Sequence, residues 1–323
     1  MKAALIRVIS FCMYYLGVDS LFYWLNRKAK RILTFHNVLP DELWFPAANG
    51  VSNKASDFER IVREVGRKYK FSTDVLDGST ATITFDDGYL NQYEIAGGIL
   101  GSMGISAIIF VAGDNMSAID QNQSLVVDQL LHWCGHAPKE LVNTANRIEH
   151  WVKVVRPQFV MDKASKGRTV LKQLDELYPF AKIWEGLPKE YLRLRLTGIP
   201  ADKLEELKKR GWEIGYHTKS HFPLSSLPDA EIRKEIEPPP GFRDVVFSYP
   251  YGELRSVDGR CIDCAKKCGY PCAVSNLPSA NSLTGRYFLP RMSLPADKYR
   301  LHFRLSGLEH FVKTRKLLPM VGG

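Results

Sequence analysis

The chain has 323 residues, of which 45% are hydrophobic and 24% are charged, a composition that excludes an intrinsically disordered protein. This length suffices for one large α/β domain or two ordinary ones. The formal net charge is +9, and much of the excess lies in residues 2–31, which contain six basic residues and one acidic residue. Because no nucleic-acid-binding motif accompanies this charge, we expect no nucleic-acid partner.

Residues 1–30 are predicted to form an N-terminal amphipathic helix, because residues 3–25 are rich in apolar and aromatic side chains and a basic flank, 27–31, follows. Gly17 and Asp19 interrupt the apolar run, so its pieces are shorter than the ~20 residues of a membrane-spanning helix. Residues 16–19 make a poor cleavage site for a secretory signal. Two alternatives remain open: the helix packs on the domain, or residues 3–31 make peripheral contact with an anionic membrane surface.

Residues 31–323 are predicted to form one α/β domain, because apolar strands alternate with helices along the chain. The first half contains predicted strands at 31–38, 81–85 and 106–111 and predicted helices at 56–69 and 91–103. Residues 114–200 are long, polar and mostly helical in pattern, with three tryptophans as apolar anchors. We interpret residues 114–200 as a helical insertion.

After the insertion the same rhythm resumes. Helices are predicted at 201–210, 229–237, 256–267 and 297–318, and strands at 212–216, 245–249, 272–275 and 287–294. A strand–helix–strand order with apolar strands indicates a parallel sheet, either open or closed as a barrel. Polar residues recur where these strands end, which is where parallel α/β barrels keep their active sites.

Four of the six cysteines lie close together, at Cys261, Cys264, Cys268 and Cys272. Their spacing differs from the paired Cys-x-x-Cys pattern of ordinary zinc sites. The first three fall on one stripe of a helix, so we interpret them as core residues, with a zinc or iron–sulfur cluster as the alternative. Unpaired thiols favour a reducing compartment. We therefore expect a cytoplasmic protein, with peripheral attachment to the cytoplasmic membrane left open.

Two adjacent carboxylates, Asp86 and Asp87, follow the predicted strand 81–85 and precede Gly88. Asp-Gly after a strand is ordinary turn chemistry. However, two carboxylates that lie close repel each other unless a cation sits between them or one keeps its proton. His217 and His221 follow another strand end, and on a helical turn their spacing of four residues would let both bind one ion.

One aspartate and two histidines leave open positions on a divalent metal for water and for a substrate carbonyl oxygen. The second aspartate is then available as a general base for that water. The combination of the carboxylate pair with the histidine pair therefore predicts metal-assisted hydrolysis.

At this point the sequence resembles a known family, the polysaccharide deacetylases (the NodB homology domain, carbohydrate esterase family 4). The resemblance rests on three motifs in order: Thr-Phe-Asp-Asp-Gly at 84–88, His-Thr-Lys-Ser-His at 217–221 and Ser-Tyr-Pro-Tyr-Gly at 248–252. Segments 34–38, 289–291 and 303–307 resemble the branch linked to exopolysaccharide synthesis. The resemblance covers most of residues 31–310 except the insertion. It implies a distorted (β/α)7-type barrel and hydrolysis of an N-acetyl, sometimes O-acetyl, group on a sugar.

Carried over by position, the resemblance implies that Asp86 is the base that deprotonates the water. It implies that one divalent transition metal is bound by Asp87, His217 and His221. Zn²⁺ is the first candidate, and Co²⁺, Ni²⁺ or Mn²⁺ are alternatives. The backbone N–H of Tyr251 would help to stabilise the oxyanion, a role that needs a fixed donor.

The chain departs from the family pattern at two places. Ser248 stands where the family often has an arginine that tunes the base. Arg291, at the end of the last predicted strand, is a candidate replacement, and a surface or structural ion pair is the alternative. The family's late Leu-x-His, which supplies the general acid, is matched only by 308–310, inside the predicted terminal helix, and we regard that match as coincidental. His36 is a candidate acid or substrate contact, with a structural histidine as the alternative, and the acid stays unassigned.

Three functions follow from these residues. The first is a metal-dependent deacetylase that acts on an amino sugar of a polysaccharide or a lipid-linked glycan precursor. The second is a related amide or ester hydrolase, such as an O-deacetylase or a deformylase. The third is a carbohydrate-binding homologue that has lost turnover. Because the chain has both aspartates and both histidines, the sequence argues against the third.

Overall fold

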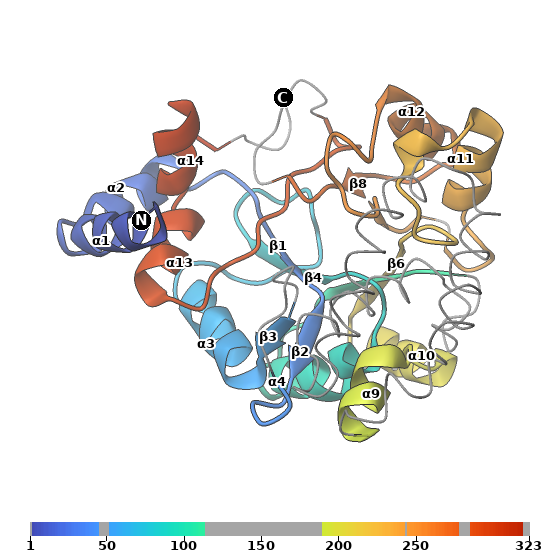
Figure 1. Cartoon of the computed structure of the whole chain (residues 1–323), viewed down its shortest axis with the longest axis horizontal. Coiled ribbons are helices and arrows are strands. Elements are labelled where there is room, and N and C mark those ends of the chain that lie inside the picture. The colour runs from blue at the N-terminus through green and yellow to red at the C-terminus, as the bar shows by residue number, and fades with distance from the viewer. Residues whose placement is uncertain (1, 45–51, 114–188, 243, 278–284, 319–323) are drawn as a thin grey trace, which may run out of the picture.

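The computed structural model describes residues 2–44, 52–113, 189–242, 244–277 and 285–318 (Figure 1). These residues form a mixed α/β fold around a curled six-stranded sheet in the order β1-β4-β5-β6-β7-β8, in which every neighbouring pair is parallel. The strands are β1 (Arg31–Phe35), β4 (Ala81–Phe85), β5 (Ile108–Val111), β6 (Glu213–Tyr216), β7 (Phe247–Ser248) and β8 (Ala273–Val274). Because all six run in one direction, their carboxyl ends meet at one edge.

One segment near the C-terminus joins the two edge strands of this sheet. Leu289 pairs with Val274 of β8, and Met292 pairs with Leu33 of β1, both in parallel. A barrel needs such a connection between its first and last strands. The segment lies within the predicted strand 287–294, although it forms isolated bridges rather than a continuous strand.

Buried residues of the strands alternate between two hydrophobic clusters. In β5, Ile109 and Val111 belong to the large cluster that includes α3 (Ala55–Gly66), whereas Ile108 and Phe110 belong to a second cluster with residues of β1 and β8. This alternation is the period-two pattern of a strand buried on both faces. The hydroxyl groups of the β4 threonines donate hydrogen bonds to backbone carbonyl oxygens. Thr84 Oγ1 donates to the Leu33 carbonyl at 2.8 Å, and Thr82 Oγ1 donates to the Ser72 carbonyl at 2.7 Å. With these hydrogen bonds, polar side chains can be buried on the face of the sheet that contacts the second cluster.

The helices that flank the sheet follow the predicted periodicity. In α3, Phe58, Ile61, Val62 and Val65 are all fully buried, as expected for one apolar stripe. The other flanking helices are α4 (Gly97–Ser102), α10 (Ala201–Lys209), α11 (Asp229–Ile236) and α12 (Gly259–Lys267). The predicted helix 91–103 begins with a π-helical turn over Gln92–Ala96 before α4. Such turns are frequent at functional sites.

The structure differs from the prediction at both ends of the chain. The expected single N-terminal helix is two helices, α1 (Lys2–Tyr15) and α2 (Val18–Leu25), which meet at 80° around Gly17 in the left-handed region. The predicted terminal helix is likewise broken into α13 (Lys298–Leu305) and α14 (Leu308–Thr314) at the left-handed Gly307. No single helix within the described ranges is long and apolar enough to cross a membrane, although the bent α1–α2 pair meets that test jointly.

The basic flank predicted at 27–31 is only partly a surface feature. Arg27 and Lys28 are exposed, but Lys30 and Arg31 are buried. The guanidinium of Arg31 donates to the carbonyl oxygens of Asn26 and Leu305, at 2.7 and 3.3 Å, and therefore fastens α2 to the end of α13. Burial lowers the pKa of Arg31, while Tyr69 and Tyr23 oppose the shift.

Two further predictions need adjustment. The first strand ends at Phe35, and after His36 the chain forms β2 (Asn37–Leu39), which pairs with β3 (Ser52–Lys54). The predicted insertion, 114–200, lies outside the described residues up to position 188, and its last part contains α9 (Lys189–Leu196). Beyond α9 the chain is bound to the loop after β4, because the Leu90 N–H donates to the Thr197 carbonyl and the Ile199 N–H to the Gly88 carbonyl.

Candidate active site

The predicted site residues converge at the carboxyl edge of the sheet. Asp86 and Asp87 follow β4, His217 follows β6, and His36 follows β1. Ser248 ends β7, and Arg291 lies in the segment that joins the two edge strands. The parallel sheet thus brings together residues that are more than 200 positions apart in the chain.

Asp87, His217 and His221 form a cluster with the composition of a metal site. One potential ligand atom from each residue lies within 4.8 Å of the other two, and all three residues are buried. Oδ1 of Asp87 is 3.6 Å from Nε2 of His217 and 3.3 Å from Nε2 of His221. This oxygen is buried and accepts no hydrogen bond from the part of the chain that the structure describes. A buried carboxylate oxygen in that state needs a cation or another donor.

The protonation of the cluster matches that of metal ligands. Nδ1 of His217 lies 2.8 Å from the Ser248 carbonyl oxygen, which can only accept, so Nδ1 carries the proton and Nε2 offers its lone pair toward Asp87. Burial lowers the pKa of His217 to about 4, against the attraction of Asp86, so the imidazole is neutral. Burial alone would raise the pKa of Asp87, but His221 and the other nearby histidines lower it to about 2. A carboxylate beside a neutral imidazole fits a zinc-like ion.

The two histidines share the site by way of a turn and not a helix, which corrects the sequence prediction. Their rings lie 4.8 Å apart, while Thr218 and His221 adopt φ values of 65° and 56°. Thr218 Oγ1 accepts the His221 N–H at 3.0 Å, and the Glu235 carboxylate accepts the Ser220 N–H at 2.8 Å. These hydrogen bonds hold the backbone of the turn in a conformation that differs from that of a right-handed helix.

Backbone strain concentrates at this edge of the sheet. Of the six described non-glycine residues with positive φ, four belong to the site: Asp87, Thr218, His221 and Tyr251. A left-handed conformation at a non-glycine residue costs of order 1–3 kcal/mol and persists only where surrounding contacts impose it. Gly88, with φ of 77°, lies so close to β5 that a Cβ atom would be 2.9 Å from Val111 Cγ1. The Asp-Asp-Gly motif therefore needs its glycine for conformation and for space.

Asp86 is held by a fully buried bidentate ion pair with Arg291. Nη1 and Nη2 of Arg291 donate to Oδ1 and Oδ2 of Asp86 at 2.7 and 2.6 Å, and neither side chain is exposed. Burial alone would raise the pKa of Asp86, but Arg291, with contributions from His217 and His36, lowers it below its ordinary value. Asp86 is therefore ionised at neutral pH.

The guanidinium of Arg291 is also saturated by its other neighbours. Its Nε donates to the Ser275 carbonyl at 2.9 Å, and its terminal nitrogens donate to Thr84 Oγ1, Ser248 Oγ and Asn276 Oδ1 at 3.1, 3.0 and 2.7 Å. Such complete pairing fixes the direction in which both oxygens of Asp86 are presented.

Comparison with known proteins assigns the chain to a family. The family model described as "Polysaccharide deacetylase" matches residues 74–273, which include both aspartates and both histidines. The chain belongs to the polysaccharide deacetylase family. The family predicted from the sequence motifs is thereby confirmed. Among the curated proteins, none matches this chain.

Solved structures of deacetylases are similar to this chain at low sequence identity. The Streptococcus pyogenes deacetylase PplD, in complex with acetate, has a TM-score of 0.50 and 13% identity, with 90% of this chain and 98% of that chain covered. A polysaccharide deacetylase from Bacillus cereus has a TM-score of 0.48 and 12% identity, covering 86% and 68%. IcaB from Ammonifex degensii has a TM-score of 0.42 and 16% identity, covering 86% and 96%.

Against the motif pattern of the polysaccharide deacetylases, the position of Arg291 is informative. Ser248 stands where an arginine is often found, and its hydroxyl donates to Asp86 Oδ1 at 3.2 Å. Arg291 pairs with the same carboxylate from the segment that joins β8 to β1. A surface ion pair, one alternative weighed for Arg291, is wrong because the side chain is fully buried.

His36 and Tyr251 lie beside the cluster. Nε2 of His36 is 3.7 Å from Oδ2 of Asp86, and its side chain is 22% exposed, so it is accessible from solvent where Asp86 is not. The ring of Tyr251 lies 5.0 Å from that of His221, and Asn276 Nδ2 donates to the Tyr251 carbonyl at 3.3 Å. His310, in contrast, lies on α14 outside this edge of the sheet, as the sequence interpretation required.

Several polar residues of the site were missed by sequence reasoning. Gln92 Nε2 donates to the carbonyl oxygens of both His36 and Asp86 and therefore ties the ends of β1 and β4 together. Glu235 accepts a hydrogen bond from the histidine turn, and Asn276 accepts one from Arg291. The sequence offered only a weak indication of Gln92. Two adjacent polar residues, Asn91 and Gln92, stand at the start of the predicted helix that follows the Asp-Asp-Gly motif.

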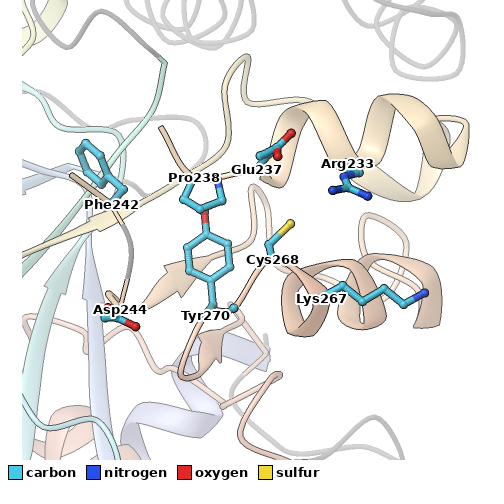
Figure 2. A pocket seen from close by; sticks show the side chains of 9 residues that line it. Arg233, Glu237, Pro238, Phe242, Asp244, Lys267, Cys268 and Tyr270 are labelled. Atoms are coloured by element: carbon cyan, nitrogen blue, oxygen red, sulfur yellow. The ribbon is translucent and has the colours of Figure 1, made fainter. Parts of the chain in front are cut away.

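The cysteine group lies apart from this site. Cys261 and Cys272 are buried, and Cys264 and Cys268 are partly buried. Figure 2 shows Cys268 beside Glu237 and Tyr270 in a pocket between α11 and α12 that contains none of the predicted site residues. Within the described ranges, the Asp87–His217–His221 group is the one set of three or more suitable side chains that could hold a metal. The core interpretation of the cysteines agrees with their packing, because Cys261 and Cys272 belong to hydrophobic clusters and the other two pack against one of them.

Proposed function

We propose that this chain is a metal-dependent hydrolase that removes an N-acetyl group from an amino sugar of a polysaccharide or a lipid-linked glycan precursor. The observation that carries the proposal is the buried convergence of Asp87, His217 and His221 beside a carboxylate that Arg291 keeps ionised. Membership of the polysaccharide deacetylase family supports the reaction class. The resemblance of segments 34–38, 289–291 and 303–307 supports an exopolysaccharide as the substrate class.

Asp87, His217 and His221 would hold one divalent transition ion, with Zn²⁺ the first candidate. When bound, such an ion supplies a Lewis acid that polarises a carbonyl group and lowers the pKa of water. The chain contributes a preformed set of one carboxylate and two imidazole side chains. The hydrogen bond from His217 Nδ1 to the Ser248 carbonyl orients the imidazole before any ion arrives.

In this proposal Asp86 accepts the proton of the attacking water. Arg291 occupies one lone pair on each oxygen of Asp86 and Ser248 Oγ occupies the second on Oδ1, so one lone pair of Oδ2 stays available for that proton. Arg291 acts as a positioning residue, because it fixes the carboxylate and keeps it ionised without touching the substrate. The N–H of Tyr251 is assigned to the oxyanion that forms on the acetyl carbonyl.

The amine leaving group needs a proton donor, and we assign this role to His36. Its imidazole lies next to Asp86, is partly exposed and is not one of the three metal-binding residues. His36 can therefore reach both the catalytic carboxylate and an incoming sugar. General acid catalysis of this kind contributes about 10²–10⁴-fold.

A catalytically impaired carbohydrate-binding homologue is less well supported. That alternative was motivated by Ser248 in place of an arginine and by the unmatched general acid. Arg291 pairs with the base in this structure, and His36 is the residue proposed here for the acid. An O-deacetylase or a deformylase would use the same residues, and only a substrate comparison separates it from the N-deacetylase. The cytoplasmic location expected from the free cysteines stays a prediction.

The decisive experiment combines metal content with acetate release. The wild type, Asp87→Ala, His217→Ala and Asp86→Asn are purified, and bound metal is measured by inductively coupled plasma spectrometry. The same samples are assayed on N-acetylglucosamine oligomers and on O-acetylated and N-formylated analogues. His310→Ala is the matched control, because this histidine lies on α14, away from the site.

We expect the wild type and His310→Ala to bind a stoichiometric transition ion and to release acetate. Asp87→Ala and His217→Ala should lose both the ion and the activity, whereas Asp86→Asn should keep the ion and lose activity. Full activity of Asp86→Asn would contradict the assignment of the base. Unchanged metal content in Asp87→Ala and His217→Ala would contradict the metal site, and release of formate without acetate would contradict the acyl specificity.

A further inference from the structure

The two ends of the chain combine into one group of helices, which we call the terminal lobe: α1, α2, α13 and α14. Phe22 of α2, Phe303 of α13 and Leu308 of α14 form a buried cluster against which Ile9 and Met13 of α1 pack. In Figure 1 these four helices lie together at one side of the molecule. The inward-facing residues of α1 and α2 thus hold the lobe together.

The outward surface of this lobe is unusually apolar. Of the twelve large hydrophobic residues that are exposed in the described chain, ten belong to residues 5–25 or 312–317: Leu5, Val8, Phe11, Tyr15, Leu16, Leu21, Trp24, Leu25, Val312 and Leu317. Leu5 is 61% exposed and Trp24 is 60% exposed, so these are not marginal cases. Exposed apolar residues are ordinary when scattered, but a concentration of this kind marks an interaction surface.

The exposed apolar residues follow helical spacing. On α1, Leu5, Val8 and Tyr15 lie on one stripe, and on α2, Leu21, Trp24 and Leu25 are spaced i, i+3 and i+4. The residues that pack inward, such as Ile9 and Phe22, lie at other positions around each helix. Each helix therefore presents a second apolar stripe that the domain does not cover.

The charge of the same surface is of one sign. In residues 4–28 and 297–318 the exposed charged side chains are all basic: Arg7, Arg27, Lys28, Lys298, Lys313, Arg315 and Lys316. The acidic residues of these ranges are not exposed to the same degree. Asp19 is buried, Asp297 pairs with Arg7 at 3.5 Å, and Glu309 pairs with Arg304 at 2.6 Å and Lys313 at 2.7 Å.

We propose that the terminal lobe docks on the surface of an anionic lipid bilayer. Apolar and aromatic stripes that enter the headgroup boundary, surrounded by lysine and arginine, are the features by which interfacial helices bind membranes. A second copy of the chain would fit this surface poorly, because two sets of seven exposed cations would then face each other. A bilayer supplies both the apolar phase and the negative charge.

The geometry also gives the orientation of the docked protein. The terminal lobe connects directly to the start of β1, at Arg31, whereas His36 and the aspartates lie at the other end of the parallel strands. Docking through the lobe therefore places the carboxyl edge of the sheet at the end of the strands that is remote from the docked start of β1. This inference does not depend on the proposed deacetylase activity.

The test is flotation of the full chain with vesicles of phosphatidylcholine alone or with a minority of phosphatidylglycerol. The variant combines Leu5→Ser, Val8→Ser, Leu21→Ser and Trp24→Ser, which change exposed side chains. The matched control combines Leu76→Ser and Leu254→Ser, the two exposed leucines outside the lobe. A third variant, Arg27→Gln with Lys28→Gln, removes charge only. Circular dichroism and the thermal midpoint verify that each variant is folded.

We expect the wild type and the leucine control to float with the anionic vesicles, and the fourfold variant to lose about tenfold or more of its partition coefficient. Raised salt and the Arg27→Gln, Lys28→Gln variant should weaken binding to anionic vesicles, because the attraction is screened. The proposal is overturned if the wild type fails to float, or if the folded fourfold variant floats as well as the wild type. It is also overturned if, without vesicles, the wild type is a dimer that the fourfold variant converts to a monomer.

Discussion

Removal of the guanidinium of Arg291 is expected to destabilise the protein and to change the sign of its pH dependence. Arg291→Met keeps the volume and apolar stem but leaves Asp86 buried without its partner. The two side chains are 0% exposed and are joined at 2.7 and 2.6 Å, so water cannot replace the lost donors. Breaking a buried pair in this way costs about 3–5 kcal/mol of the free energy of unfolding.

The size of the interaction itself comes from a double-mutant cycle. Arg291→Met, Asp86→Asn and the double variant are unfolded in urea, and the coupling free energy is obtained from the three differences. We expect a coupling of about 2–3 kcal/mol, because the second substitution removes the charge that the first one stranded.

A matched control is provided by Arg193 and Glu94. These residues pair with the same two distances, 2.7 and 2.6 Å, but their side chains are 44% and 32% exposed. The coupling in that exposed pair should stay below about 1 kcal/mol. A coupling for Arg291–Asp86 that does not exceed the Arg193–Glu94 value would refute the argument that burial gives the pair its strength.

The pH dependence follows from the direction of the pKa of Asp86. In the wild type burial alone would raise this pKa, but Arg291 lowers it below its ordinary value. The ion pair therefore stabilises the native state at neutral pH, and this stability is lost as pH falls through the low pKa of the folded state. In Arg291→Met burial is unopposed by the guanidinium, so the pKa rises and the native state holds a proton that the unfolded chain releases above about pH 4. Its stability should then fall as pH rises from 4 to 7, and an unchanged slope would contradict this reasoning.

Three further predictions concern single side chains. Gly88→Ala should lower the free energy of unfolding by more than the ~1–2 kcal/mol of left-handed strain alone, because its Cβ would meet Val111; Gly104→Ala, with φ of 65° and open space, is the control, and equal losses would contradict the steric argument. Asp258→Ala should cost about 1 kcal/mol in urea unfolding without affecting acetate release, because its carboxylate accepts two backbone N–H groups at the start of α12. His36→Gln should keep the metal and lower kcat about a hundredfold or more, and an undiminished kcat would remove His36 from the proton-donor role.

The sequence by itself determined the elements whose signals are local. The strand 81–85 has the bounds that alternation predicts, and the apolar stripe of α3 is buried as its spacing requires. The two carboxylates and the histidine motif identified the family, because these residue types at strand ends have few other uses. Such features depend on neighbouring residues, which a linear sequence displays directly.

Only the tertiary structure decided how the site is completed. Arg291 and Asp86 are separated by 205 positions, and no periodicity shows that the closing segment would place one against the other. Spacing of four between His217 and His221 suits a helix or a turn equally well, and left-handed residues fixed by the distant Glu235 select the turn. The same holds for the chain ends, where α1 and α2 bury one face against α13 and α14 and expose the other. Contacts between residues far apart in the chain are set by three-dimensional packing, and for that reason the sequence alone did not determine them.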